Sequence, residues 1–321
     1  MTSDNINQPR INRPWINHPR VGVIGLGNAG CAIAAAFLKV SASASASASV
    51  SGYDIDAGRR DAAAEIGITS HDNMASFSAA VDVIILSLPH PEISLAVTKE
   101  LLAFFDAPGD VPKLIIDTST VTPQTATDCA AMARASGVGF VDAAIAGGVA
   151  SMAAGQMTFF MGGSDADKAL ARPVLNPVAV DIHDLGAIGA GMGIKVVNNA
   201  VMHALMVVLI EAFAMSKKLG VPNDTLISIL NREEGILRPL IHRVRERMDH
   251  GDFDGGMSVT NARKDSCLAL VTAQDLGVPL FAISASHTPY EIAEAKGLGA
   301  ADYAALSRLW EDWAQIEFKE K

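Results

Sequence analysis

Short apolar runs alternate with helix-like segments through the first half of the chain. The first run, Val21 to Ile24, is followed by a segment with the composition of a helix at 31–40. The same pattern predicts strands at 50–53, 81–86, 114–117, 140–142, 158–161 and 178–182, and helices at 57–65, 92–105 and 123–136. Strands separated by helices predict an α/β fold with a doubly wound sheet of parallel strands.

The longest apolar segment spans residues 194–219. Its residues are good helix formers, and Gly220 and Pro222 follow it as a stop signal, so the sequence predicts one long helix. At a rise of about 1.5 Å per residue this helix would be roughly 40 Å long, which suits a connection between two domains. We expect it to be buried because it is apolar on nearly all sides.

Beyond Pro222 the sequence has a helical pattern and no strand pattern. Helices are predicted at 225–231, 237–248, 259–276, 279–296 and 301–313. The second of these segments carries four arginines, which form either a solvated face or a site for an anionic substrate or a partner subunit: Arg238, Arg243, Arg245 and Arg247. The sequence therefore predicts an all-helical second domain attached to the long helix.

Composition narrows the class of protein. The chain has 321 residues, of which 50% are hydrophobic, and this is enough for two domains with separate cores. Its net charge of -10 argues against nucleic acid as a partner, because binding phosphates requires Lys and Arg. Polar residues interrupt the long helix, so we expect no membrane span, which needs roughly 20 apolar residues.

Cysteine usage indicates a reducing compartment. Cys31, Cys129 and Cys267 lie far apart, and this spacing suggests neither a disulfide framework nor a metal site. We therefore expect a cytoplasmic location and no bound metal. Residues 1–19 lack the apolar core of a secretory signal, so we expect them to form a disordered tail.

A glycine pattern lies between the first predicted strand and its helix. It consists of Gly25, Leu26, Gly27, Asn28, Ala29 and Gly30. A tight turn with free N–H groups at a helix start can bind the pyrophosphate of a dinucleotide, although the same pattern also forms turns that bind no ligand. The second strand ends in Asp54, a carboxylate suited to the ribose hydroxyls of NAD. Together these two features predict a dinucleotide site.

Residues 41–49 alternate Ser and Ala and offer no side chains suited to a core. We expect a solvated loop here, which accommodates the long interval between the glycine pattern and Asp54. The expected organisation is then a tail at 1–19, a dinucleotide-binding Rossmann domain at 20–185, and a helical domain at 186–321 that serves substrate binding and dimerisation.

The long helix carries one polar patch. Lys195, Asn198 and Asn199 are three and four residues apart, so they share one face of the helix. Buried polar groups need partners, which favours the floor of an active site. The alternative is a lysine that reaches solvent near the helix start, with both amides bonded to nearby backbone.

Three loops after predicted strands could contact a cofactor or substrate. Leu88 and Pro89 follow one strand and Ser119 follows the next, and the alternative role for these loops is to cap the following helix. Gly147 and Gly148 follow a third strand. Their N–H groups can bind a carboxylate, whereas a plain turn is the alternative.

The sequence resembles the β-hydroxyacid dehydrogenase family, which includes 3-hydroxyisobutyrate dehydrogenase, tartronate semialdehyde reductase and 6-phosphogluconate dehydrogenase. Four motifs at 24–30, 142–148, 191–199 and 264–269 carry the resemblance, which spans 21–313. It implies that Lys195 is catalytic, that Asn199 holds the substrate and that Lys264 lies against the cofactor. Gly147 and Gly148 would bind the substrate carboxylate, where the usual Ser is replaced by Ala146.

The resemblance implies hydride transfer between NAD and a small 3-hydroxyacid or its semialdehyde, with Lys195 as general acid and base. Asp54 favours NAD, because the extra phosphate of NADP would face a like charge, but Arg59 and Arg60 keep NADP as an alternative. Rival functions are an NADPH-dependent imine reductase, a group that generally lacks this lysine, and a nucleotide-sensing module without turnover. A homodimer or homotetramer is expected, because the apolar second half needs to cover its surface.

Overall fold

The computed structural model describes residues 19–44, 49–105, 113–232 and 235–320. Contacts between Cα atoms divide the chain into two compact units, 1–199 and 200–321. The predicted tail lies outside the described residues except for its last position, and so do residues 45–48 of the Ser-Ala repeat.

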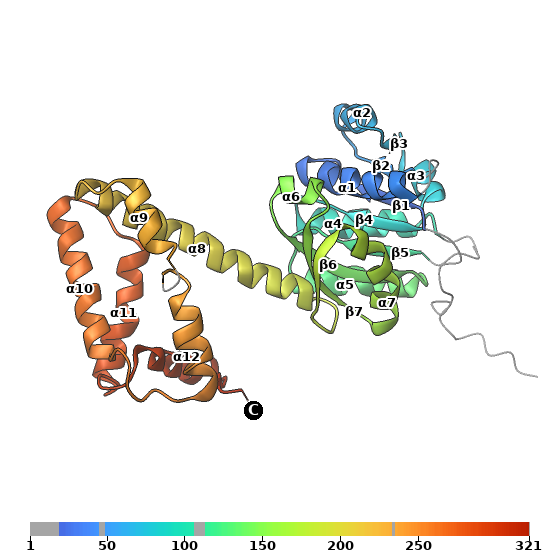
Figure 1. The fold of residues 1–321 in the computed structure, drawn as a ribbon. Helices are drawn as coiled ribbons and strands as arrows, with labels where there is room; N and C mark the ends of the chain where they lie inside the picture. Colours follow the sequence, from blue (N-terminus) through green and yellow to red (C-terminus); the bar gives the residue numbers. More distant parts are fainter. Residues whose placement is uncertain (1–18, 45–48, 106–112, 233–234, 321) are drawn as a thin grey trace, which may run out of the picture. The chain divides into compact units, whose positions relative to one another are not determined.

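The first unit is built on one eight-stranded sheet with the strand order β3-β2-β1-β4-β5-β6-β7-β8 (Figure 1). The strands are β1 (Val21–Ile24), β2 (Ser51–Tyr53), β3 (Thr69–Ser70), β4 (Val83–Leu86), β5 (Leu114–Asp117), β6 (Gly139–Ala146), β7 (Met157–Gly163) and β8 (Ala179–Asp184). Strands β4 and β5 are buried along their whole length, as expected for central strands covered on both faces. The predicted doubly wound α/β fold is confirmed.

Two strands depart from the predicted parallel order, because β7 and β8 both run opposite to the first six strands. Strand β7 pairs with β6 in the antiparallel sense, whereas the other strand pairs of the sheet are parallel. Only residues 147–156 join β6 to β7, and a parallel crossover needs about a dozen residues or more. The chain therefore turns back on itself at this point.

Helices cover both faces of the sheet. The first unit contains α1 (Asn28–Ala44), α2 (Ala57–Glu65), α3 (Met74–Ala80), α4 (Pro91–Leu102), α5 (Pro123–Ala135), α6 (Val149–Ala153) and α7 (Asp165–Leu175). Ile33 and Phe37 of α1 pack on one face with Val174 of α7, and Phe77 of α3 packs on the other face with Leu101 of α4. Each face thus has its own apolar core.

The sequence pattern misses the shorter elements and one extension. Strand β3 and helices α3, α6 and α7 were not expected, and all except the 11-residue α7 are short. Helix α3 begins where the Asn73 side chain accepts a hydrogen bond from the N–H of Ser76, a cap that the apolar pattern does not register. Helix α1 continues through residues 41–44, where a loop was expected, because Ala favours the helix.

Helix α8 (Ala190–Lys218) links the first unit to the helices of the second, which were predicted as an all-helical region. The second unit contains α9 (Asn223–Leu230), a π-helix (Leu240–Arg245), α10 (Val259–Leu276), α11 (Ala282–Ala295), a short 3-10 helix (Tyr303–Leu306) and α12 (Ser307–Ala314). The π-helix replaces half of the predicted helix at 237–248. Two arginines there approach the buried carboxylate of Asp302, Arg243 at 3.2 Å and Arg247 at 3.6 Å.

The expected burial of the long helix is wrong for the single chain. Val197 of α8 is 59% exposed, and Met206 and Ile210 are exposed to a similar degree. Its apolar residues pack against too few elements of the same chain to be covered. In the part of the chain that the structure describes, α8 is also the one helix whose length and composition would let it cross a membrane, which is weak evidence because core helices meet the same criterion.

Candidate active site

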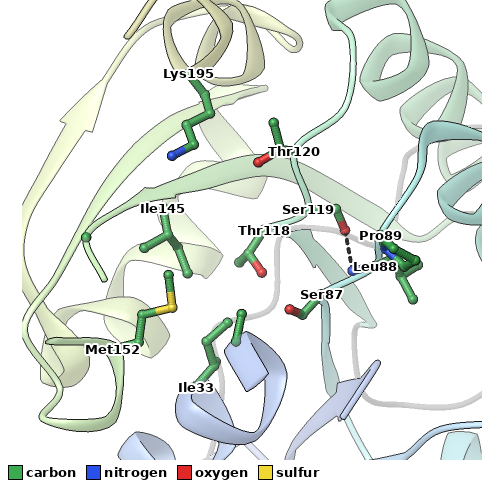
Figure 2. Close-up of a pocket in the computed structure, with 12 residues that line it drawn as sticks. Ile33, Ser87, Leu88, Pro89, Thr118, Ser119, Thr120, Ile145, Met152 and Lys195 are labelled. Atoms are coloured by element: carbon green, nitrogen blue, oxygen red, sulfur yellow. Dashed lines mark hydrogen bonds between the residues drawn. The ribbon is translucent and has the colours of Figure 1, made fainter. Parts of the chain in front are cut away.

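A pocket opens in the first unit at the carboxyl ends of the central strands, where open α/β sheets bind their ligands (Figure 2). Its lining residues come from the glycine loop and α1, from the loops after β4, β5 and β6, and from α6 and α8. They are Ala29, Ile33, Ser87, Leu88, Pro89, Thr118, Ser119, Thr120, Ile145, Gly147, Met152 and Lys195. Six of the residues predicted for the site are therefore brought together here: Ala29, Leu88, Pro89, Ser119, Gly147 and Lys195.

The loop between β1 and α1 has the shape that a dinucleotide requires. Gly25 has φ of +89°, and a Cβ atom there would lie 2.2 Å from the carbonyl oxygen of Ser87. A Cβ on Gly30 would lie 1.7 Å from the carbonyl oxygen of Gly25, so only glycine fits either position. At Gly27, by contrast, a Cβ would meet nothing closer than 3.9 Å, which leaves the backbone open to a ligand. The residues of this loop fit a bound dinucleotide.

Asp54 at the end of β2 is bonded to that loop. One oxygen of its carboxylate accepts a hydrogen bond from the N–H of Leu26 at 2.8 Å, and the other accepts one from the N–H of Asp56 at 2.9 Å. The guanidinium of Arg59 lies 3.5 Å from the same carboxylate. Asp54 therefore stabilises the glycine loop, a role that the sequence did not reveal, besides lying where a ribose would be recognised.

Ser119 joins two loops of the pocket wall. Its hydroxyl accepts a hydrogen bond from the N–H of Leu88 at 2.9 Å (Figure 2), and its own N–H donates to the carboxylate of Asp117 at 2.9 Å. The helix after this loop is capped by Thr122, whose hydroxyl accepts from the N–H of Thr125. Ser119 is therefore not a helix cap, and its hydroxyl lies at the pocket.

Lys195 lies on the second turn of α8, and its amine points into the pocket (Figure 2). Burial lowers the pKa of this amine from its usual value, because a charged ammonium is poorly solvated there. Lys195 is the only titratable side chain among the residues that line the pocket. A lysine whose pKa is lowered in this way can both donate and accept a proton more readily than a fully solvated one.

Of the other residues predicted to bind substrate, one lines the pocket and three are close in sequence to residues that line it. Gly147 has φ of +138° and lines the pocket, and Gly148 follows it as the first residue before α6. Asn198 and Asn199 are half-buried on α8, on the turn after Lys195, and are not among the lining residues.

Lys264 belongs to the second unit. It lies on α10, its side chain is 63% exposed, and its amine pairs with the carboxylate of Asp265 at 3.1 Å. An exposed ion pair of this kind contributes little to stability.

Sequence reasoning missed the apolar wall of the pocket. Ile33, Ile145 and Met152 line it together with the polar loops. Ile33 lies one turn after the glycine loop, and Ile145 lies near the end of β6, just before Gly147. Because both are close in sequence to recognised motifs, they could have been predicted to line the same pocket. Met152 belongs to α6, which the apolar pattern did not predict.

Comparisons with known proteins agree with this geometry. The model of the NAD binding domain of 6-phosphogluconate dehydrogenase matches residues 20–189, and that of the NAD-binding domain of NADP-dependent 3-hydroxyisobutyrate dehydrogenase matches residues 189–310. The 2-(hydroxymethyl)glutarate dehydrogenase of Eubacterium barkeri is 30% identical over 92% of this chain and 96% of its own length.

Solved structures show the same fold. The 3-hydroxyisobutyrate dehydrogenase of Mycobacterium tuberculosis, solved with L-serine, is 28% identical with a TM-score of 0.60, over 91% of this chain and 98% of that one. An imine reductase variant from Myxococcus stipitatus, solved with NAD+, has a TM-score of 0.78 over 90% of this chain and 98% of that one. Its identity is 18%, so this likeness concerns the fold alone.

An open α/β sheet with a glycine loop between its first strand and the following helix is typical of proteins that bind a nicotinamide dinucleotide. The match to the first family model covers more than half of the chain. This chain belongs to the β-hydroxyacid dehydrogenase family. The predicted family, the oxidoreductase activity on hydroxyacids and the use of NAD, with NADP as the alternative, are confirmed.

Proposed function

We propose that this enzyme oxidises a small 3-hydroxyacid to the corresponding semialdehyde, or reduces the semialdehyde, with Lys195 as general acid and base. The observation that supports this most is the amine of Lys195, which enters a pocket that, among the described residues, no other titratable side chain lines. In oxidation the neutral amine accepts the hydroxyl proton. In reduction the ammonium returns that proton and stabilises the developing alkoxide.

The glycine loop and the loops beside it would hold the cofactor. Gly25, Leu26, Gly27, Asn28, Ala29 and Gly30 would bind the pyrophosphate, Asp54 the ribose hydroxyls, and Leu88, Pro89 and Ser119 the part that lies in the pocket. A bound NAD would supply the hydride acceptor for oxidation, and a bound NADH the hydride donor for reduction. The family resemblance implies Lys264 as a further cofactor residue, and this role stays a prediction from the sequence.

The substrate carboxylate would be bound by backbone N–H groups of Gly147 and Gly148, which follow strand β6 into the pocket region. Ser119 would add a hydroxyl, and Asn198 and Asn199 would orient the reacting group from the helix that carries Lys195. Ala146 offers no hydroxyl at the end of β6, so we expect weaker binding of a lone carboxylate than a serine there would give.

Two rival functions are disfavoured by particular residues. An imine reductase would not need Lys195, and its likeness to this chain concerns the fold alone. A nucleotide sensor without turnover would leave the amine of Lys195 in the pocket without a role. Because family members are dehydrogenases, turnover is the better account of this side chain.

We also propose that the chain works as a homodimer or homotetramer. Apolar residues of α8 are exposed to solvent in the single chain. The same apolar face on a second copy of the chain would bury them. The carboxylate of Glu211 on the same helix accepts hydrogen bonds from three N–H groups at the start of α11, which suits a helix packed among protein elements. The domain limits of 20–185 and 186–321 and the cytoplasmic location stay predictions from the sequence.

Absorbance of NADH tests the proposed function. The purified enzyme with NAD is offered a panel of small 3-hydroxyacids, and with NADH the matching semialdehydes. We expect saturable formation or loss of NADH with at least one pair. Cyclic imines serve as the rival panel, and turnover of imines without any hydroxyacid activity would contradict the proposal.

A further inference from the structure

Helix α8 begins on a carboxylate from a distant strand. Asp142 on β6 is fully buried, and its two oxygens accept hydrogen bonds from the N–H of Gly189 at 2.9 Å and the N–H of Met192 at 2.8 Å. The first N–H groups of a helix lack partners within the helix, and a polar side chain just before the helix usually supplies one. Gly189 has no side chain, so Asp142 performs this role from 47 residues earlier in the chain.

The fit between this carboxylate and the helix start is close. A Cβ on Gly191 would lie 2.9 Å from an oxygen of Asp142 and 2.2 Å from the carbonyl oxygen of Phe160. A Cβ on Gly162 would lie 2.6 Å from the other oxygen of Asp142. Glycines at these positions let the helix start approach the sheet, and the carboxylate then determines where its first turn lies.

Lys195 follows Met192 by three residues, so the place of the first turn determines where the amine enters the pocket. Displacement of a reacting group by about 1 Å can cost about 100-fold in rate. We propose that Asp142 is a positioning residue of this enzyme, which fixes the start of α8 and thereby the amine of Lys195. This inference rests on the proposed role of Lys195, and Asp142 itself is not among the residues that line the pocket.

The charge of Asp142 should also act on Lys195. A carboxylate at a helix start offsets the positive end of the helix dipole. Asp117 on β5 is the carboxyl group that faces Asp142 in the register of the sheet. In the part of the chain that the structure describes, Lys195 is the one titratable side chain that lines the pocket. Burial raises the pKa of the Asp142 carboxyl, against the hydrogen bonds from Gly189 and Met192, which favour its ionised form. The ionised form would favour the ammonium of Lys195, so Asp142→Asn is expected to lower the pKa of that amine.

The test compares Asp142→Asn with Asp82→Asn. Asp82 is also buried and accepts a backbone hydrogen bond, from the N–H of Arg20 at 3.0 Å, but it lies at the amino end of β4, away from the carboxyl ends that form the pocket. For each variant we would measure kcat, the dissociation constant of the cofactor, and the pKa of Lys195 in the ligand-free protein by NMR of ¹³C-methylated lysines. Loss of one signal in Lys195→Ala assigns it.

For Asp142→Asn we expect a kcat lower by about tenfold or more, a cofactor dissociation constant within about twofold of wild type, and a lower Lys195 pKa. Asp82→Asn should change stability alone. A folded Asp142→Asn protein with unchanged kcat and unchanged Lys195 pKa would overturn the proposal. The NMR measurement needs no turnover, so failure of the proposed function is distinguishable from failure of this inference.

If Asp142→Asn does not fold, a second pair of variants tests whether the start of α8 positions Lys195. Gly191→Ala pushes the helix start away from Asp142 and Phe160, whereas a Cβ on Gly193 would meet only the side chain of Pro123 at an ordinary 3.7 Å. We expect Gly191→Ala to lose kcat at unchanged cofactor affinity and Gly193→Ala to resemble wild type. Equal kcat in the two alanine variants would contradict the proposal.

Discussion

Asp117 on β5 lies directly opposite Asp142 on β6 in the register of the sheet. Partners in neighbouring parallel strands face the same side, so two carboxyl groups share one buried face. Burial raises the pKa of Asp117 to about 6, against the opposing effect of its hydrogen bonds with Ser119, and the charge of Asp142 raises it further. Asp117 thus keeps its proton to a higher pH in the folded protein than in the unfolded chain.

This pairing predicts a pH-dependent gain in stability for Asp117→Asn. An unfolded Asp loses its proton near pH 3.9, so wild type loses about 2 to 3 kcal/mol of unfolding free energy as the pH rises from about 4 to above 6. Asparagine stays neutral and keeps an oxygen for the N–H of Ser119. Urea unfolding should show the variant to be more stable than wild type at pH 7.5 but not at pH 4.

Asp61→Asn on the exposed surface of α2 is the matched control, with little change expected at either pH. An equal effect of Asp117→Asn at both pH values would show that the charge is not responsible.

Glu211 connects two helices of the second unit. Its carboxylate accepts hydrogen bonds from the N–H groups of Phe281, Ala282 and Ile283 at 2.6, 2.9 and 3.0 Å. Burial alone would raise the pKa of Glu211, but these bonds outweigh it and lower the pKa below its usual value. The stabilisation is therefore present above the pKa of an unfolded Glu, near 4.3, and is lost as the pH falls through the folded value.

We expect Glu211→Gln to lower the unfolding free energy at pH 7 by about 1 to 3 kcal/mol, because a neutral amide accepts these bonds more weakly. The difference from wild type should shrink as the pH falls below about 4. Glu317→Gln, at an exposed position, is the control. A difference that is constant with pH would argue against the ionised carboxylate as the cause.

Cofactor choice should depend on Asp54. Its carboxylate repels the extra phosphate of NADP, whereas the exposed guanidinium of Arg59, 3.5 Å away, can attract it. We expect wild type to have the higher kcat/KM with NAD. Asp54→Asn should shift the ratio towards NADP, and Arg59→Ala should lower kcat/KM with NADP more than with NAD. A clear preference of wild type for NADP would refute this assignment.

The exposed face of α8 predicts that a charge placed there prevents assembly. Val201 is 55% exposed on this helix, and Val201→Asp should leave a monomer where wild type is a dimer or larger by light scattering at micromolar concentration. Val180 on β8 is 70% exposed, and Val180→Asp should assemble as wild type does. A monomeric wild type would refute the proposed assembly.

The apolar pattern predicted some elements to the residue and missed others. Strand β1, helix α2 and helix α10 have the predicted bounds. Each combines a clear pattern of apolar residues with a recognisable first residue. The direction of β7 was not predictable from its composition, since it depends on the short connection through α6. Burial of α8 was expected because composition cannot distinguish a helix covered by its own chain from one that another copy covers.

The motifs of the site could be predicted from the sequence for a physical reason. A tight backbone turn around a dinucleotide requires glycine at positions 25 and 30, and proton transfer requires a titratable group such as Lys195. The residues that hold these motifs in place could not be predicted from the sequence. Asp142 lies in a strand as one acidic residue among apolar ones, and only the folded sheet brings its carboxylate to the start of α8. The apolar lining of the pocket likewise has no pattern of its own in the sequence.

The role of Lys195 is tested most directly by Lys195→Ala, assayed as NADH formation at saturating hydroxyacid and NAD. We predict a kcat lower by about 100-fold or more, with cofactor affinity unchanged, because the amine acts on the substrate proton and not on the dinucleotide. Nicotinamide fluorescence gives the affinity for NADH. A variant with near-wild-type kcat would contradict the account.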